Sequence, residues 1–232
     1  MNLVNKKTFV IGDIHGCYYT LLDLLNKLPK DSRIIMIGDL CDRGLYSKEV
    51  IDFVIKNNYE CVLGNHEDFM LKHIDDYFNE RANRWYDNPH IGGKETINSY
   101  KGDVKTLKEH IEYLKTLPKY ILIDKFFITH GLGLPYFNRK DENDIDIQDG
   151  LIKARIEDED TNWGNSWEKN WHEYDLINIF GHTIYDDVKI GKNYFGIDTG
   201  CQSGGKLTAI EIPTMNIIDV PLNKKDIIWN KC

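Results

Sequence analysis

The stretch Gly38-Asp39-Leu40-Cys41-Asp42-Arg43-Gly44 directly follows an apolar run, Arg33 to Ile37. A short apolar run that ends in glycine and polar residues predicts a buried strand that leads into a turn. Asp39 could bridge two cations through its two carboxylate oxygens, and Arg43 offers a planar fork that fits a phosphate. Taken alone, the stretch is equally consistent with an ordinary acidic turn that contains an internal ion pair.

Four other short apolar runs end in residue types that bind metals. They are Thr8 to Ile11 before Asp13 and His15, Glu60 to Leu63 before Asn65, Phe126 to Thr129 before His130, and Ile177 to Phe180 before His182. Because α/β proteins place their sites at the edge where strands end, we expect these side chains to lie together. Five such strand ends favour a metal site over a set of unrelated polar turns.

These motifs resemble those of the calcineurin-like metallophosphoesterases, specifically the phosphoprotein phosphatase family, to which the symmetrical diadenosine tetraphosphate hydrolases are related. Four further segments resemble its bacterial and phage members, namely Gly92 to Tyr100, Ile179 to Thr183, Ile197 to Gly200 and Gly204 to Thr208. The eukaryotic C-terminal signature is absent. The expected fold class, which the resemblance also implies, is α/β. Two mixed β-sheets pack as a sandwich flanked by helices, in four layers, with the site where loops from both sheets meet.

The resemblance also implies a dinuclear metal centre. Asp13, His15 and Asp39 would hold one metal, and Asp39, Asn65, His130 and His182 would hold the other. Carboxylates and imidazoles suit Mn, Fe or Zn, and Mn is expected first because the set contains no thiolate. A pair of metals would acidify a bridging water to hydroxide for direct in-line attack on phosphorus, so that no covalent phosphoenzyme is needed.

Several residues beside these ligands are expected to act on the substrate. Arg43 would bind the phosphate oxygens together with Asn65 and His66. His66 would protonate the leaving oxygen, and Asp42 would orient its ring and keep it cationic. The alternative for His66 is a structural hydrogen-bonding role. Glu67 is expected to support the loop.

Arg155, within the segment Leu151 to Ile156, is expected to be a second phosphate-binding residue. The bacterial and phage phosphatases carry such an arginine between the two late histidine motifs. The tryptophan that often precedes it is absent here, and Lys153 lies nearby instead. The alternative is that Arg155 pairs with Asp158 or Glu159 along an exposed helix.

Three functions are compatible with these residues. The favoured one is a metal-dependent phosphatase that hydrolyses phosphomonoesters, foremost phosphoserine and phosphothreonine in proteins. The alternative is hydrolysis of dinucleoside tetraphosphates, and a non-enzymatic alternative is an inactive phosphate-binding regulator. The presence of every expected metal ligand and of His66 argues against an inactive protein.

Composition predicts one cytoplasmic catalytic domain over residues 1–232. The chain has five cysteines without a C-x-x-C pair, which suits a reducing compartment, although Cys41 in the central turn could be oxidised. The N-terminus lacks a signal-like stretch, and no apolar run approaches membrane-spanning length. The net charge of −8 argues against an extended nucleic-acid surface, so phosphate binding must be local.

Apolar periodicity predicts an initial β-α-β-α-β order with parallel strands. Helices are expected over 18–28, 46–58, 67–78 and 103–117, a hairpin over 120–129, and strands of a second sheet over 193–197, 207–212 and 215–220. The segment 81–100 is expected to be a solvated loop or a cap that faces the substrate.

Two further segments could be interpreted as ligand-binding sites. The Asp-rich stretch 138–150 lacks EF-hand spacing, which favours a solvated loop over a calcium site. Trp163, Trp167 and Trp171 would share one face of a helix, and such a stripe belongs more often to a core than to a stacking platform for a nucleoside.

Overall fold

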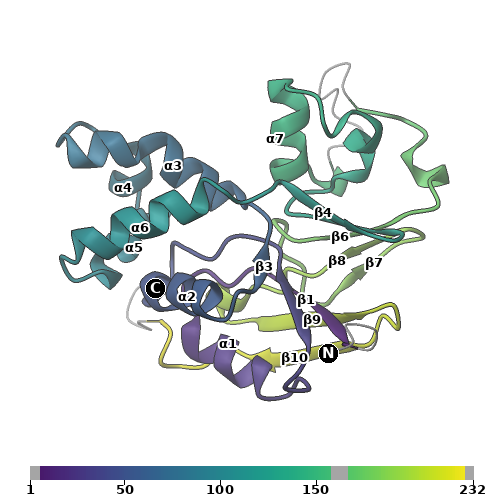
Figure 1. Cartoon of the computed structure of the whole chain (residues 1–232), viewed down its shortest axis with the longest axis horizontal. Helices are drawn as coiled ribbons and strands as arrows, with labels where there is room; N and C mark the ends of the chain where they lie inside the picture. Colours follow the sequence, from purple (N-terminus) through teal and green to yellow (C-terminus); the bar gives the residue numbers. More distant parts are fainter. Residues whose placement is uncertain (1–5, 158–166, 228–232) are drawn as a thin grey trace.

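The computed structural model describes residues 6–157 and 167–227. Two five-stranded sheets pack against each other, and helices cover their outer faces (Figure 1). The helices α3 to α6 gather on one side of the molecule, whereas α7 lies over the second sheet (Figure 1). The predicted α/β sandwich is therefore confirmed.

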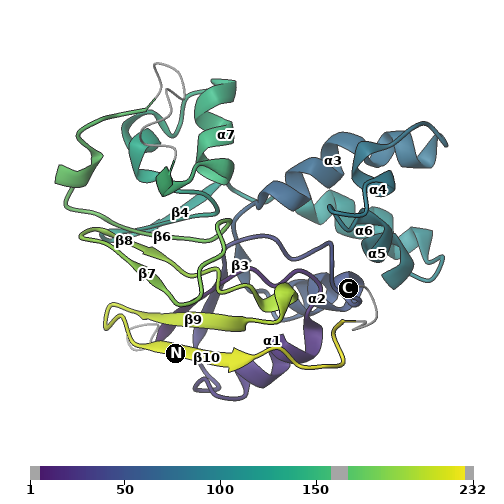
Figure 2. The same ribbon diagram turned by 180° about the vertical axis from the view of Figure 1, so that it is seen from behind.

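The first sheet has the order β10-β9-β1-β2-β3. As predicted, β1 (Thr8–Ile11), β2 (Arg33–Met36) and β3 (Glu60–Cys61) are parallel. The strands β9 (Lys206–Ile212) and β10 (Ile217–Pro221) join antiparallel beside β1. Figure 2 shows β9 and β10 next to each other. The assignment of both to the second sheet was wrong, because an apolar strand pattern shows which faces are buried but not which edge the strand joins.

The second sheet has the order β4-β5-β6-β8-β7. Its strands are β4 (Tyr120–Ile123), β5 (Phe126–Thr129), β6 (Ile177–Phe180), β7 (Lys189–Ile190) and β8 (Tyr194–Gly196). The predicted hairpin is present as β4 and β5, which pair antiparallel around Asp124. The strands β5, β6 and β8 run parallel, so the loops after β5 and β6 leave the same edge.

Three hydrophobic clusters correspond to the three interfaces between the four layers. Within β1, Phe9 and Ile11 pack toward the helices, whereas Val10 packs between the sheets. Within β5, Ile128 faces the first sheet and Phe127 faces the outer helical layer. Successive side chains of a strand point to opposite faces, so these short strands are apolar on both faces.

The four longer helices predicted from periodicity are present within a few residues. They are α1 (Tyr18–Leu25), α2 (Ser47–Lys56), α3 (Asn65–Phe78) and α6 (Val104–Leu114). The segment 81–100 is not a solvated loop, because it contains α4 (Arg84–Asp87) and α5 (Gly93–Ser99). Trp85 of α4 is fully buried and packs against Gly93.

The acidic stretch 138–150 also differs from the expected loop. It contributes to the 3₁₀ helix η2 (Leu134–Arg139) and to α7 (Ile145–Lys153). The side chain of Asp144 accepts hydrogen bonds from the first turn of α7, so its carboxylate caps a helix and does not define a calcium loop.

Only part of the tryptophan stripe can be assessed, because Trp163 lies outside the described residues. Trp171 is fully buried in the cluster beneath η2 and α7, which confirms the core interpretation for this residue, and Trp167 packs against Tyr136. Trp171 lies in a short 3₁₀ helix, η5 (Trp171–Glu173). Trp167 and Trp171 therefore do not share one face of an α-helix.

Cys17, Cys41, Cys61 and Cys201 are free and buried, while Cys232 is not described. Burial, followed by the charge of Asp42, raises the pKa of the Cys41 thiol well above its usual value, which disfavours the thiolate that oxidation requires. Of the helices in residues 6–157 and 167–227, none is both long and apolar enough to span a membrane.

Candidate active site

The structure brings all six predicted metal ligands together at the ends of five strands. Asp39 follows β2 and lies at the centre of the group. Its Oδ2 lies 3.4 Å from His15 Nε2, and its Oδ1 lies 3.3 Å from His130 Nε2. One carboxylate oxygen therefore faces each of two ligand groups, which is the arrangement that a bridging carboxylate requires.

Asn65 and His182 complete the second group. The Asn65 Oδ1 atom lies 2.8 Å from His130 Nε2 and 2.7 Å from His182 Nδ1. Asn65 is the first residue of α3, whereas His182 follows β6, so the group depends on contact between the two sheets. The ligand atoms of Asp13, Asp39 and His130 also lie within 4.8 Å of one another, as do those of His15, Asp39 and His66.

The charges of this cluster fit divalent cations. Asp13 and Asp39 are almost fully buried, and a third buried carboxylate, Asp198, lies beside Asp13. Burial, and then the charge of Asp198, raise the pKa of Asp13 well above its usual value. Cations would offset this repulsion, and the oxygen and nitrogen donors suit Mn, Fe or Zn.

The backbone around the site adopts a conformation that side chains disfavour. His15, Asp39, Asp42, Arg43 and His182 have φ angles of 47°, 51°, 70°, 68° and 65°. Non-glycine residues seldom occupy this left-handed region, and such outliers gather at functional sites where the surrounding structure holds them. Asp42 and Arg43 are adjacent, so the central turn reverses sharply and aims both side chains at the site.

Glu67 stabilises this turn, as predicted. Its carboxylate accepts hydrogen bonds from the backbone N–H groups of Asp39 at 2.8 Å, Leu40 at 2.8 Å and Gly64 at 3.1 Å. A Cβ atom at Gly64 would lie only 2.2 Å from Asp39 Oδ1. Glycine at this position is therefore required for α3 to approach the shared ligand.

His66 and Asp42 are paired as the sequence predicts. His66 Nδ1 lies 2.7 Å from Asp42 Oδ2. Burial lowers the pKa of His66, but the charge of Asp39 and the hydrogen bond to Asp42 outweigh it, so that the pKa is raised overall. Arg43 lies beside both histidines, with Nη2 3.0 Å from His66 Nε2 and Nη1 2.7 Å from His15 Nε2.

Three residues that support the site were not predicted. Trp85 Nε1 donates to Asp42 at 3.1 Å, and Thr96 Oγ1 donates to Asp42 Oδ1 at 2.7 Å. Asp198 lies beside Asp13. Thr96 and Asp198 fall inside segments that the sequence analysis singled out, but no spacing rule connects them to residues so distant in the chain.

Arg155 lies close to the candidate metal site. It follows the end of α7, and its Nε lies 3.4 Å from His182 Nε2. Arg155 is therefore not on an exposed helix, and Asp158 and Glu159, its alternative partners, lie outside the described residues. Its phosphate-binding role remains a prediction.

Arg155→Ala is expected to lower kcat/KM by about 10- to 1000-fold and to weaken inhibition by inorganic phosphate, because a fork of donors beside the phosphate is lost. Its exposed side chain should leave the melting temperature nearly unchanged. Arg155→Lys should recover only part of the activity, since a point charge cannot replace the fork. Unaltered phosphate inhibition in Arg155→Ala would show that Arg155 does not contact the phosphate.

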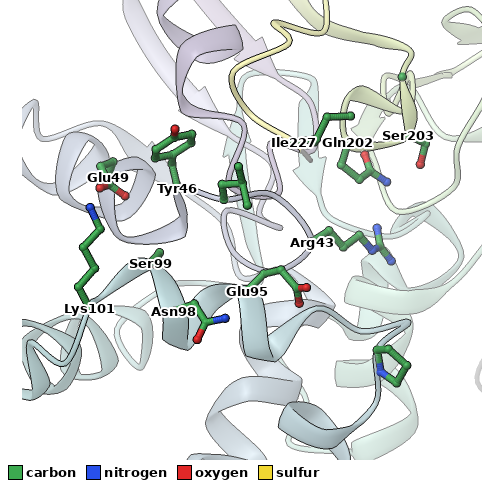
Figure 3. Close-up of a pocket in the computed structure, with 13 residues that line it drawn as sticks. Arg43, Tyr46, Glu49, Glu95, Asn98, Ser99, Lys101, Gln202, Ser203 and Ile227 are labelled. Carbon is green, nitrogen blue, oxygen red and sulfur yellow. The ribbon is translucent and has the colours of Figure 1, made fainter. Parts of the chain in front are cut away.

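Two cavities adjoin the site, and we name each after the catalytic candidate that lines it. The Arg43 cavity, of about 700 Å³, runs between the central turn, α5 and the 3₁₀ helix η6 (Cys201–Ser203) (Figure 3). The His66 cavity, of about 430 Å³, lies along the start of α3 and includes Asn65. Pro89 lines the first cavity and Ile91 the second, so the segment 89–91 runs between them.

Comparisons with known proteins agree with this geometry. The calcineurin-like phosphoesterase family model matches residues 6–188. The chain is 27% identical to the asymmetrical bis(5'-nucleosyl)-tetraphosphatase PrpE of Anoxybacillus flavithermus, over 91% of this chain and 93% of that protein. A protein of the same name from a Geobacillus species is 28% identical, over 93% and 94% of the two chains.

Solved structures are similar at the level of the fold. One is the crystal structure of a protein provisionally named a diadenosine tetraphosphatase. It is 22% identical to this chain with a TM-score of 0.66, and the match covers 97% of each chain. A serine/threonine phosphatase from Saccharomyces cerevisiae has a TM-score of 0.62 and 17% identity, covering 95% of this chain and 81% of that one. With its metal-ligand clusters, its two-sheet fold and a family match over most of its length, the chain belongs to the calcineurin-like phosphoesterases, which are metal-dependent hydrolases.

Proposed function

We propose that this protein is a two-metal hydrolase that cleaves dinucleoside tetraphosphates asymmetrically, giving a nucleoside triphosphate and a nucleoside monophosphate. The observation that supports this substrate is the similarity, over nine-tenths of both chains, to relatives named asymmetrical bis(5'-nucleosyl)-tetraphosphatases. The two cavities, one lined by Arg43 and the other by Asn65 and His66, offer space for a substrate with two arms.

The residues present fit the metal pair. Asp13, His15 and Asp39 would hold one ion, and Asp39, Asn65, His130 and His182 would hold the other. Asp13 would join the first set through the shared Asp39, since its ligand atom lies within 4.8 Å of those of Asp39 and His130. When bound, the ions supply an activated water and positive charge near the phosphoryl oxygens. We propose Mn as the first candidate because the set combines carboxylates with imidazoles and lacks a thiolate.

Arg43 would bind the phosphate, and His66 would donate a proton to the leaving oxygen. While His66 is neutral, the guanidinium can donate to its Nε2. A bound phosphate would attract the fork of Arg43, leaving Nε2 to carry the proton that Asp42 stabilises. His66 could then donate this proton to the departing oxygen.

Phosphoserine and phosphothreonine in proteins, which the sequence analysis favoured, are our second candidate substrates. The supporting observation is the segment Gly92 to Tyr100, which resembles the bacterial and phage protein phosphatases and which contacts the site through Thr96. The likeness to the yeast protein phosphatase concerns the fold alone. Because the relatives similar over nearly the whole chain have a dinucleotide in their names, we place that substrate first.

A direct competition tests this order of substrates. Purified protein with Mn is given diadenosine tetraphosphate and a phosphothreonyl peptide, and the products are separated by chromatography. We expect ATP and AMP to form with kcat/KM at least about 100-fold above that for the peptide, which corresponds to about 3 kcal/mol of differential transition-state binding. The reverse preference would favour the protein phosphatase function. Asp39→Asn, prepared identically, controls for contaminating phosphatases.

A further inference from the structure

We propose that the two cavities fix the direction in which the substrate binds. The triphosphate arm lies in the His66 cavity and the opposite nucleoside lies in the Arg43 cavity, so that water attacks the phosphorus that carries this nucleoside. This orientation rests on the proposed function. It adds which bond forms and which product receives the oxygen of water.

The His66 cavity is suited to a polyphosphate. Lys72 and Lys153 both line it, whereas Asp68 is the one carboxylate among its described lining residues. Lys72 Nζ lies 2.7 Å from Asp68 Oδ2, and Lys153 Nζ lies 2.6 Å from Asp149 Oδ2. Each lysine also lies 3.8 Å from the other aspartate, so two carboxylates hold the two ammonium groups side by side. Each ammonium carries three donors, so these contacts hold the lysines in place and leave further N–H groups for phosphate oxygens.

The Arg43 cavity is suited to a nucleoside. Its charged lining residues balance, with Arg43 and Lys101 against Glu49 and Glu95. Figure 3 shows Gln202 on the same side as Arg43 and Glu49 on the other. Glu49 Oε2 and Gln202 Oε1 are buried and have no donor among the residues that the structure describes. Such acceptors match ribose hydroxyls or the amino group of a base, and they would repel phosphate oxygens.

The positions of His66 and Arg43 then set the direction of the reaction. An acid must lie beside the leaving oxygen, and His66 lines the cavity that holds the triphosphate arm. The water oxygen forms a bond to the α-phosphorus of the nucleoside in the Arg43 cavity, and the bond from that phosphorus to the α,β-bridging oxygen breaks. The bridging oxygen takes the electron pair and a proton, the water loses its proton to solvent, and the products are AMP and ATP.

Isotope labelling tests this direction. Diadenosine tetraphosphate is hydrolysed in water enriched in oxygen-18, and both products are analysed by mass spectrometry. We expect the label in AMP and not in ATP. Label in ATP would overturn the proposed direction while leaving the proposed function intact. Formation of two molecules of ADP would contradict the asymmetrical reaction. Absence of hydrolysis would contradict the proposed function. Either result would also overturn the proposed orientation.

Variants of the lysines provide an independent test. In Lys72→Gln combined with Lys153→Gln, we expect ATP to inhibit p-nitrophenyl phosphate hydrolysis about 10- to 100-fold more weakly, with metal in excess over nucleotide, because charged hydrogen bonds are lost. Inhibition by AMP should not change. Lys105→Gln is the matched control, since the exposed Lys105 side chain also forms an i,i+4 pair, with Glu109, and does not line the cavity. Equal effects on ATP and AMP, or none on either, would overturn the assignment of the triphosphate arm to the His66 cavity.

Discussion

Asp39→Asn is expected to abolish turnover, with kcat lowered by at least about 1000-fold, because one carboxylate serves both metal groups. Asparagine has nearly the same shape and keeps an oxygen that can accept from His66 N, which donates to Asp39 Oδ1 at 3.0 Å. It removes the negative charge and one of the two oxygens. Both metal positions are weakened while the turn can keep its backbone contacts to Glu67.

Elemental analysis and activity should therefore change together. We expect two equivalents of divalent metal in the native protein and fewer than one in Asp39→Asn, with a chelator silencing the native protein and added metal restoring it. Asp187→Asn is the control, since the Asp187 side chain is 85% exposed and pairs with Lys206, which is not a proposed ligand. Full turnover by protein that elemental analysis finds free of metal would falsify the two-metal mechanism.

The convergence of the proposed ligands could be predicted because each of these residues follows a recognisable local pattern. Asp13, His15, Asp39 and Asn65 come directly after short apolar runs, and parallel strands bring such positions to one edge. The hairpin of β4 and β5 likewise follows from two apolar runs separated by a turn. These inferences need only the order of residues within about ten positions.

The features that were missed depend on contacts between distant parts of the chain. The pairing of β9 with β1 joins positions about 200 residues apart, and nothing in the strand itself specifies this neighbour. Trp85 lies in the segment 81–100, which was expected to be a solvated loop or a cap, yet its indole N–H donates to the carboxylate of Asp42, because α4 and α5 fold back against the central turn. Asp42 and Arg43 also have a left-handed backbone conformation that both residues disfavour locally, so contacts with the surrounding fold must hold them in it.

The sequence motifs specify the substrate less closely than they specify the metal site. The strand-end motifs specify a chemistry that many phosphoesters share. Of their residues, Arg43, Asn65 and His66 line the two cavities, whose other lining residues come mostly from α2, α3, α5, α7, η6 and the segments beside them. The sequence motifs therefore could not rank phosphoprotein against dinucleotide. The names of the relatives support the dinucleotide that we propose as the substrate, and the lysines of the His66 cavity would supply donors for its phosphates.

His66→Asn is expected to reduce phenyl phosphate hydrolysis by about 100-fold or more, and p-nitrophenyl phosphate hydrolysis by much less. The asparagine amide can still donate to Asp42, as His66 Nδ1 does at 2.7 Å, so the buried carboxylate keeps a partner. The amide cannot supply a proton to the leaving oxygen. Nitrophenolate departs readily without one, whereas phenolate does not.

A series of substituted phenyl phosphates separates the acid from a structural histidine. If His66 donates the proton, the logarithm of kcat/KM should depend more steeply on leaving-group pKa in His66→Asn than in the native protein. His73→Asn is the matched control, because His73 lies on the same helix, α3, and pairs with Asp76 away from the site. Equal losses across the whole series, with metal content unchanged, would assign His66 to positioning Arg43, whose Nη2 lies 3.0 Å from its Nε2. The proton for the leaving oxygen would then have to come from solvent.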